Sequence, residues 1–355
     1  MRILFVADAA SIHTRRWLEH FRDRGDEVHV ASFRAFEVPG VTLHLLPTFG
    51  LGKLGYFYAL MALPRIFSRV RPDLVHAHYL TSYGFLAAFA GLRPLVVTAW
   101  GSDALIAPRQ SRLMHYFASY AVRHASVVTT LADHMNPAVA ELGVPLDTIT
   151  ATPFGVDTDF FRPDPAATAP HEPLKLICTR NFDVVYDVGT LIRALEKVFS
   201  RGRRLQVDLV GDGPLRPELV DLARQLRIDS HIKFHGHVEH KVLAGLLAGA
   251  DIFVTPALSD GNNVSLNEAM ACGCFPVATD IPANAQWVTH DRNGYLYPPG
   301  DVDRLAQVIE AALDNSALRS SARVENRQIA ETRVDWRICA RRMEDLYQGI
   351  VERRG

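Results

Sequence analysis

Two carboxylates, Asp260 and Glu268, stand on one polar segment with seven residues between them. The segment lies between two apolar runs, Ile252–Val254 and Phe275–Ala278, which have the character of buried strands. We expect Asp260 on a loop and Glu268 where a helix has already begun. The unpaired N–H groups and the positive dipole end of such a helix favour an anion such as a diphosphate. Carboxylates on either side of an anion would accept hydrogen bonds from hydroxyl groups, which is the layout of a nucleotide-sugar. The alternative is a solvated loop acid followed by an acid that the helix dipole stabilises.

The residues after this helix start carry a family resemblance. Positions 268–277 read Glu-Ala-Met-Ala-Cys-Gly-Cys-Phe-Pro-Val. This stretch resembles the donor-binding segment of the retaining glycosyltransferases of family 4, which have the two-domain GT-B fold. Their pattern is Glu, seven residues and Glu, followed by Ala-Met-Ala-x-Gly. Asp260 stands where the family has the first Glu, so its carboxylate reaches one methylene less far.

The resemblance implies a retaining hexosyltransferase that uses a UDP- or GDP-linked sugar. The acceptor would be a hydroxyl of a glycan, a lipid-linked molecule or a small molecule. Arg180 follows an apolar strand, and its guanidinium suits the diphosphate. The family places a Lys a few residues later, where this chain has Tyr186. Arg180 and Asp260 are therefore the catalytic candidates, and Glu268 is expected to bind the ribose.

The other donor-binding candidates lie on turns of the second half. Asp260 is expected to hold the sugar hydroxyls together with the backbone of Gly261, Asn262 and Asn263, while the amides of Val264 and Ser265 face the diphosphate. Gly211 belongs to the sequence Gly-Asp-Gly-Pro, which lacks the third glycine of a dinucleotide fingerprint. The family places this turn near the nucleotide, and it reads the base with backbone groups that match His237 and Val238.

Three residues of the first half are acceptor-side candidates: Ser11, Trp100 and Asp103. Ser11 ends the loop after the first strand, where alanines replace the family's glycines. Trp100 replaces a His that lies near the transferred sugar in many relatives, and an indole stacks on a sugar but exchanges no proton. This fits the front-face attack that the resemblance implies, in which the departing phosphate takes the acceptor's proton. Asp103 either contacts an acceptor hydroxyl or caps a helix.

We expect neither a metal nor another cofactor. His76 and His78 share one face of a strand end, and three histidines crowd into residues 235–240, but neither group has the ligand set of a metal site. The four cysteines show no disulfide or zinc spacing, which is typical of small buried residues in a reducing compartment.

Length and pattern predict an α/β chain with two Rossmann-like domains that face each other across a cleft. The 355 residues are too many for one ordinary core. Strands alternate with helices in both halves, which favours parallel sheets with ligands at the carboxyl ends of the strands. We place the acceptor-side domain at residues 1–160 and the nucleotide-sugar domain at 173–335, joined through Asp164–Glu172, which is rich in Pro and small residues. The resemblance implies that the last helix, 336–352, packs back on the first domain.

The net charge of −1 gives no field that would attract nucleic acid. The chain starts directly with a strand rather than a secretory leader, and no apolar run is long enough to span a bilayer, so we expect a cytoplasmic protein. Residues 49–71 mix large apolar side chains with basic ones. They form either a crossover helix with a sheet-facing apolar stripe or a peripheral contact with the inner membrane face. Two other functions stay open: a nucleotide-sugar epimerase or hydrolase, and a non-catalytic sugar-nucleotide-binding protein.

Overall fold

The structure is a computed structural model that describes residues 1–48, 55–164 and 172–353. The chain divides into two compact units, which are described separately. Unit 1 comprises Met1–Phe154 and Cys339–Gly355, and unit 2 comprises Gly155–Ile338. Residues 165–171 of the predicted linker Asp164–Glu172, and the first six residues of 49–71, lie outside the described residues.

The core of unit 1 is a parallel sheet with the order β3-β2-β1-β4-β5-β6-β7 among the described residues. Continuous apolar runs form its central strands because both of its faces are covered. The strands are β1 (Arg2–Val6), β2 (Glu27–Ser32), β3 (Thr42–Leu45), β4 (Leu74–His78), β5 (Leu95–Ala99), β6 (Val127–Thr130) and β7 (Ile149–Ala151).

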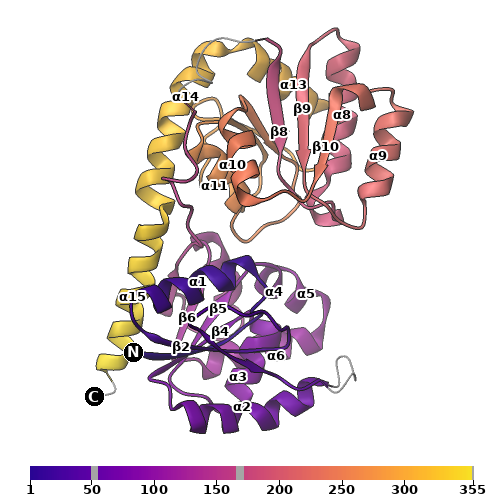
Figure 1. Cartoon of the computed structure of the whole chain (residues 1–355). Coiled ribbons are helices and arrows are strands. Elements are labelled where there is room, and N and C mark those ends of the chain that lie inside the picture. Colours follow the sequence, from indigo (N-terminus) through magenta and orange to yellow (C-terminus); the bar gives the residue numbers. More distant parts are fainter. Residues whose placement is uncertain (49–54, 165–171, 354–355) are drawn as a thin grey trace. The chain divides into compact units, whose positions relative to one another are not determined.

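Helices cover both faces of this sheet (Figure 1). They are α1 (Ile12–Asp23), α2 (Tyr56–Val70), α3 (Phe85–Phe89), α4 (Ser102–Leu105), α5 (Ala107–Gln110), α6 (Arg112–His124), α7 (Asn136–Ala140) and, from the end of the chain, α15 (Trp336–Glu352). Helix α15 packs against α1, where Phe21 and Tyr347 stack at 4.8 Å and His20 contacts Glu344 at 2.7 Å.

Unit 2 holds a second parallel sheet, with the order β10-β9-β8-β11-β12-β13 in the part of the chain that is described. Its strands are β8 (Leu174–Cys178), β9 (Leu205–Val210), β10 (Ile232–Gly236), β11 (Ile252–Thr255), β12 (Phe275–Thr279) and β13 (Tyr295–Tyr297). Its helices are α8 (Val188–Ser200), α9 (Arg216–Gln225), α10 (His240–Ala248), α11 (Val264–Ala271), α12 (Pro282–Ala285), α13 (Val302–Asp314) and α14 (Ser316–Ile329). The apolar stripes of α8 and α13 pack on one face of the sheet and build one of its two core clusters.

The sequence pattern predicts strands at Leu74–His78 and Leu95–Ala99, and both are confirmed residue for residue as fully buried strands. Asp301 caps α13, because its carboxylate accepts the Arg304 N–H at 2.8 Å. Helix α2 continues through Pro64, from Tyr56 to Val70, so this proline does not break it. The sequence analysis did not anticipate α6, whose buried side consists of small residues and one Val: Ala118, Ser119, Ala121 and Val122.

A buried polar chain joins α15 to the sheet of unit 1. The His76 ring lies between the Tyr347 hydroxyl at Nδ1 and the Thr98 hydroxyl at Nε2, the latter at 2.6 Å. Thr98 in turn contacts Thr129 at 2.6 Å. Burial lowers the pKa of His76 well below its ordinary value, so the ring is a neutral hydrogen-bonding partner inside the core.

Candidate functional site

The Arg180 guanidinium is the centre of the polar cluster in unit 2. Arg180 follows β8, and only 6% of the residue is exposed. Its Nη2 donates to Asp260 Oδ2 at 2.6 Å, and its Nη1 donates to Asn263 Oδ1 at 2.7 Å. The Tyr186 ring lies 4.2 Å from its central carbon, a cation–π contact. The structure thus brings Arg180 together with Asp260 and Asn263, which follow it by 80 and 83 residues in the chain.

Asn263 holds this loop in place from inside the unit. Its side-chain oxygen caps α11 by accepting the Leu266 N–H at 3.1 Å. Its amide nitrogen donates to Thr255 at 3.2 Å and to Asn284 at 2.9 Å. Asn263 is fully buried, so these contacts are structural, and the sequence analysis had considered only its backbone. Asn284 carried no sequence motif that would have singled it out.

The start of α11 is also tied to the end of β8. The Ser265 hydroxyl donates to the Thr179 carbonyl at 3.1 Å, which fixes the helix beside Arg180. The Val264 N–H donates to the Asn262 carbonyl at 2.9 Å. This amide is therefore occupied within the loop, in contrast to the open amide that was expected at Val264. The Asn262 side chain lies inward, where its oxygen accepts the Trp287 indole N–H at 3.3 Å.

The Gly211 turn packs directly on the backbone of the Arg180 loop. A Cβ atom at Gly211 would lie 2.2 Å from the Arg180 carbonyl oxygen, and the φ of Gly211 is +151°, so only glycine fits. The Gly211 N–H also donates to the Gly236 carbonyl at 3.0 Å, which connects this turn to the end of β10. Beyond it, His237 is exposed and Val238 packs partly on the core.

Glu268 lies on α11, and 13% of its side chain is exposed. Its Oε1 is 4.0 Å from Nε2 of His240, the first residue of α10. The His240 ring also packs against Phe160 and Phe161, at centroid distances of 5.2 and 5.1 Å. The sequence analysis had treated His240 only as a member of a histidine run, so its contact with Glu268 is an addition from the structure.

Trp100 lies in an aromatic cluster after β5 of unit 1. Its indole ring packs against Phe154 at 5.0 Å, His78 at 5.2 Å and His13 at 5.9 Å. His13 in turn stacks on Phe154 at 4.2 Å. Trp100 thus belongs to an aromatic cluster with rings from three other segments. The sequence had not indicated that His13 or Phe154 would lie beside Trp100. Ser11 precedes α1, and its carbonyl accepts the Arg15 N–H at 2.9 Å.

Asp103 lies inside α4, whose N-cap is Gly101, so it is not the helix-capping residue that was one of the two expectations. Its carboxylate is fully buried and accepts the N–H groups of Leu80 at 2.7 Å, and of Trp100 and Gly101 at 2.9 Å each. Burial raises the pKa of Asp103 above its ordinary value, against the opposing effect of these hydrogen bonds. The carboxylate therefore shapes the loop that carries Trp100, and in this conformation it does not reach the surface where an acceptor hydroxyl would lie.

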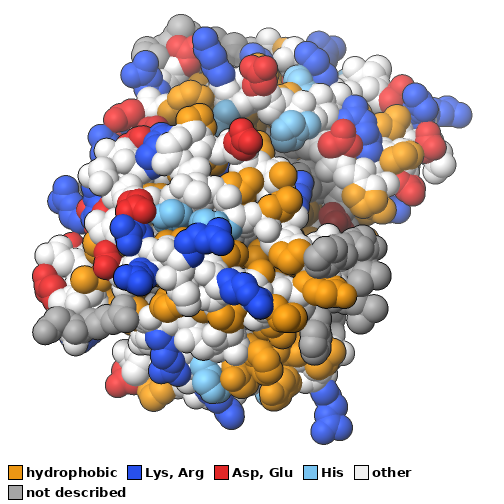
Figure 2. Space-filling model, turned by 60° about the horizontal axis from the view of Figure 1, so that its bottom comes forward, with side chains coloured by type: hydrophobic (Ala, Val, Ile, Leu, Met, Phe, Trp, Pro, Cys, Tyr) orange, Lys and Arg blue, Asp and Glu red, His pale blue; other side chains and the backbone are white. Residues whose placement is uncertain are grey.

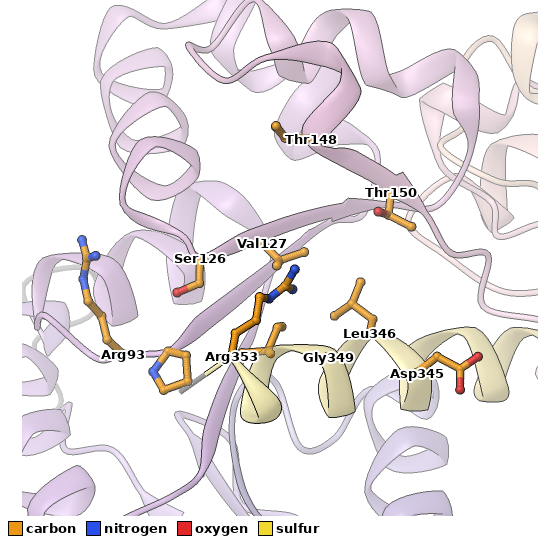
Figure 3. Close-up of a pocket in the computed structure, with 11 residues that line it drawn as sticks. Arg93, Ser126, Val127, Thr148, Thr150, Asp345, Leu346, Gly349 and Arg353 are labelled. Atoms are coloured by element: carbon orange, nitrogen blue, oxygen red, sulfur yellow. The ribbon is translucent and has the colours of Figure 1, made fainter. Parts of the chain in front are cut away.

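A pocket of about 910 Å³ in unit 1 lies away from the candidate residues (Figure 3). It is lined by Arg93 and Ser126, which precede β5 and β6, by Thr150 of β7, and by Asp345 and Leu346 of α15. It therefore opens at the amino ends of the strands, whereas ligands of parallel sheets bind at the carboxyl ends. None of the candidate residues lines this pocket.

Among the described residues, no three His, Cys, Asp or Glu side chains form a group that could hold a metal ion. Burial lowers the pKa of His78 to about 3, so it stays neutral at physiological pH. All four cysteines are buried thiols. No helix in the described ranges combines the length and apolar character needed to cross a membrane.

Comparison with known proteins places this geometry among sugar-transferring enzymes. Residues 2–131 match the family model described as glycosyl transferase 4-like, and residues 173–315 match glycosyl transferases group 1. The D-inositol 3-phosphate glycosyltransferase of Xylanimonas cellulosilytica is 30% identical over 310 residues, which are 79% of this chain and 73% of that protein. The glycogen synthase of Mycobacterium tuberculosis is 28% identical over 294 residues, 80% of this chain and 70% of that one.

The fold also matches solved structures. Anabaena HepE, crystallised in complex with UDP and glucose, aligns with a TM-score of 0.84 and 19% identity over 98% of this chain and 100% of that one. The sucrose-phosphate synthase of Thermosynechococcus elongatus aligns with a TM-score of 0.83 and 18% identity, covering 98% of each chain.

Proposed function

Because the chain belongs to the family 4 type of glycosyltransferases with the GT-B fold, and is thus a hexosyltransferase, we propose that it moves a sugar with retention from a nucleoside-diphosphate sugar to an acceptor hydroxyl. The observation that carries this proposal is the buried Arg180 guanidinium beside the start of α11. A buried cation next to a helix N-terminus is a suitable place for a diphosphate that gains charge as it leaves.

Arg180 is both held and available. Its contacts with Asp260 and Asn263 use one N–H of each terminal nitrogen, and its Nε–H is buried. The second N–H of each terminal nitrogen is left for phosphate oxygens. The Tyr186 ring restrains the plane of the guanidinium from one side. A cation that is already oriented needs less reorganisation as charge develops on the leaving group, which is the condition for strong stabilisation of the transition state.

Asp260 has two tasks in this proposal. Without donor it neutralises Arg180 at 2.6 Å. When a diphosphate takes over part of that neutralisation, the carboxylate becomes free to accept hydrogen bonds from sugar hydroxyls. The shorter reach of Asp compared with Glu explains why this residue can stay close to Arg180 while it faces the sugar.

The acceptor side needs no protein base in this mechanism. Retention by front-face attack breaks the bond between the anomeric carbon and the phosphate oxygen while the acceptor oxygen bonds to the same face of that carbon. The acceptor's proton passes to the departing phosphate. Trp100 would then contribute a stacking surface for a sugar, together with His13 and Phe154.

A panel of uridine and guanosine diphosphate sugars tests the proposal, starting with UDP-glucose because HepE was crystallised with UDP and glucose. A true donor at a hundredfold excess over its Kd should stabilise the protein by about 2.7 kcal/mol. Transfer is then measured with acceptors that carry sugar, lipid-linked and small-molecule hydroxyls. Hydrolysis of the donor without transfer to any of these would favour a hydrolase, and binding without turnover would favour the non-catalytic alternative.

A further inference from the structure

A surface of unit 1 exposes large apolar side chains that the proposed reaction does not use. We define the aromatic face as the outward sides of α2, α3 and α6, with the exposed residues Tyr58, Met61, Phe89, Leu113 and Tyr116. Between 39% and 57% of each of these residues is exposed. Helix α3 contacts both α2 and α6, so the three helices form one layer. Figure 2 shows hydrophobic side chains gathered in one region of the surface, with Lys and Arg side chains around them.

The exposed rings are connected to one another. Phe89 contacts Tyr120 at 5.7 Å, and Tyr120 contacts Tyr116 at 6.0 Å. Phe85 lies beneath them and stacks on Phe117 at 4.1 Å. The exposed rings therefore rest on a connected layer of aromatic side chains. This distinguishes the face from single exposed apolar residues, which need no explanation.

The α2 helix shows both features that the sequence had presented as alternatives. Ala59 and Leu63 are fully buried, which accounts for its inward stripe. Its outward side places Tyr58, Met61 and Arg65 at the spacing i, i+3 and i+7, all of them exposed. The inward stripe alone would have left the outward side polar, so the outward apolar residues need a separate reason.

The charge around this face is mainly positive. Residues 55–126 contain seven arginines and two aspartates, although the whole chain has a net charge of −1. Asp103 is fully buried and contributes nothing at the surface, while Asp73, which follows α2, is exposed and accepts the Arg2 N–H at 2.7 Å. All seven arginines are exposed: Arg65, Arg69, Arg71, Arg93, Arg109, Arg112 and Arg123.

We propose that the aromatic face docks on the surface of a bilayer that contains anionic lipids. Exposed Tyr and Phe side chains suit the boundary between headgroups and acyl chains, and arginines suit lipid phosphates. A second copy of the chain fits less well. A symmetric dimer through this face would bring its arginines close to those of the partner, with no exposed acidic residue of the three helices to compensate. The proposal does not depend on the proposed sugar transfer.

Sedimentation of the full chain with lipid vesicles tests the docking. The protein should sediment with vesicles that contain phosphatidylglycerol, remain in solution with phosphatidylcholine alone, and be released by high salt. Each arginine replaced by Gln at positions 65, 69 and 112 should weaken binding by about fivefold, the factor for one basic residue near an anionic surface.

Leu113→Asp is the decisive variant, because it places a carboxylate on the aromatic face, where 56% of Leu113 is exposed. Its matched control is Val324→Asp, which changes an exposed apolar residue of α14 in unit 2. We expect Leu113→Asp to abolish vesicle binding and Val324→Asp to bind as the unchanged protein, with equal thermal unfolding of both variants. Equal vesicle binding by the two variants would overturn the proposal, as would no preference of the unchanged protein for anionic vesicles. A dimer in lipid-free solution that Leu113→Asp dissociates would assign the face to a second copy. Donor binding is measured on the same samples, and its outcome bears only on the proposed reaction.

Discussion

The two units have similar parallel sheets but use the carboxyl ends of their strands differently. In unit 2, this edge concentrates a buried cation, a carboxylate and side-chain amides: Arg180, Asp260 and Asn263 lie within hydrogen-bonding distance. In unit 1, the corresponding edge holds aromatic side chains, and Trp100 packs against His13 and Phe154. The carboxylate at this edge, Asp103, is buried and accepts hydrogen bonds from backbone N–H groups.

The difference teaches that fold alone does not decide where a charged substrate binds. Both units also contain buried side-chain networks, and the network around Asn263 in unit 2 includes the charged Arg180. The network of unit 1 is a chain of neutral groups, Tyr347, His76, Thr98 and Thr129, because burial keeps the histidine uncharged. We therefore expect variants in unit 2 to change turnover and variants in the unit 1 network to change stability.

The largest expected effect comes from Arg180. Arg180→Ala should lower kcat by about 10²- to 10³-fold, the scale for one lost donor to a developing anion. Arg180→Lys should recover only part, since an ammonium cannot make a two-pronged contact. Tyr186→Lys in the Arg180→Ala background should restore some rate, because the Tyr186 ring is 4.2 Å from the guanidinium carbon.

Single-turnover transfer measures these variants, with Arg224→Ala as the control. Arg224 is an exposed arginine that pairs with Asp221 on α9 of the same unit. If Arg180→Ala kept kcat within about threefold, or 0.7 kcal/mol of barrier, another cation would serve the leaving group.

The next effect concerns Glu268. Glu268→Ala should weaken donor binding by about 1.5–3 kcal/mol, the scale for a hydrogen bond to a charged group. Ribose contacts are the same in the ground and transition states, so KM for the donor should rise while kcat stays nearly constant. Steady-state kinetics measure this, with the exposed Glu218→Ala in α9 as the control. A collapse of kcat at unchanged KM would place Glu268 at the reacting centre instead.

Unit 1 should respond in stability alone. Tyr347→Phe removes the partner of His76 Nδ1 inside the core and should lower the free energy of unfolding by about 1–3 kcal/mol, the penalty for an unsatisfied buried group. Tyr116→Phe, on an exposed ring of the same unit, should change it by less than about 0.5 kcal/mol. Urea unfolding measures both. Donor affinity should be equal in the two variants, and a lower affinity of Tyr347→Phe would show that the network reaches beyond stability.

The smallest expected effect is that of metal removal. We predict that turnover persists in excess chelator, because the proposed leaving-group stabilisation uses Arg180 and backbone dipoles rather than a divalent ion. Initial rates with and without chelator measure this. A complete loss of turnover that added magnesium or manganese reverses would contradict it.

Features that one continuous stretch of sequence determines could be predicted, whereas contacts between residues far apart in the chain could not. Buried parallel strands are nearly all apolar, so β4 and β5 could be placed residue for residue. The segment from Asp260 to Glu268 could be found because loop, helix start and family pattern coincide in one stretch. The partners that complete the site could not, since Asn284 and His240 meet Asn263 and Glu268 only through the folded sheet. The role of Asp103 depended on its burial, which its position after a strand did not determine.

Unit 1 is composed of two separate stretches of the chain, with unit 2 encoded between them. Residues 1–154 are therefore translated well before Cys339–Gly355, which complete the core of unit 1. Until position 347 has been translated, the nascent sheet lacks the ring that stacks on Phe21 and the hydroxyl that satisfies His76. Domains usually fold from the amino terminus as they emerge. Here residues 1–154 emerge before unit 2, so they remain without the contacts of α15 while all of unit 2 is synthesised.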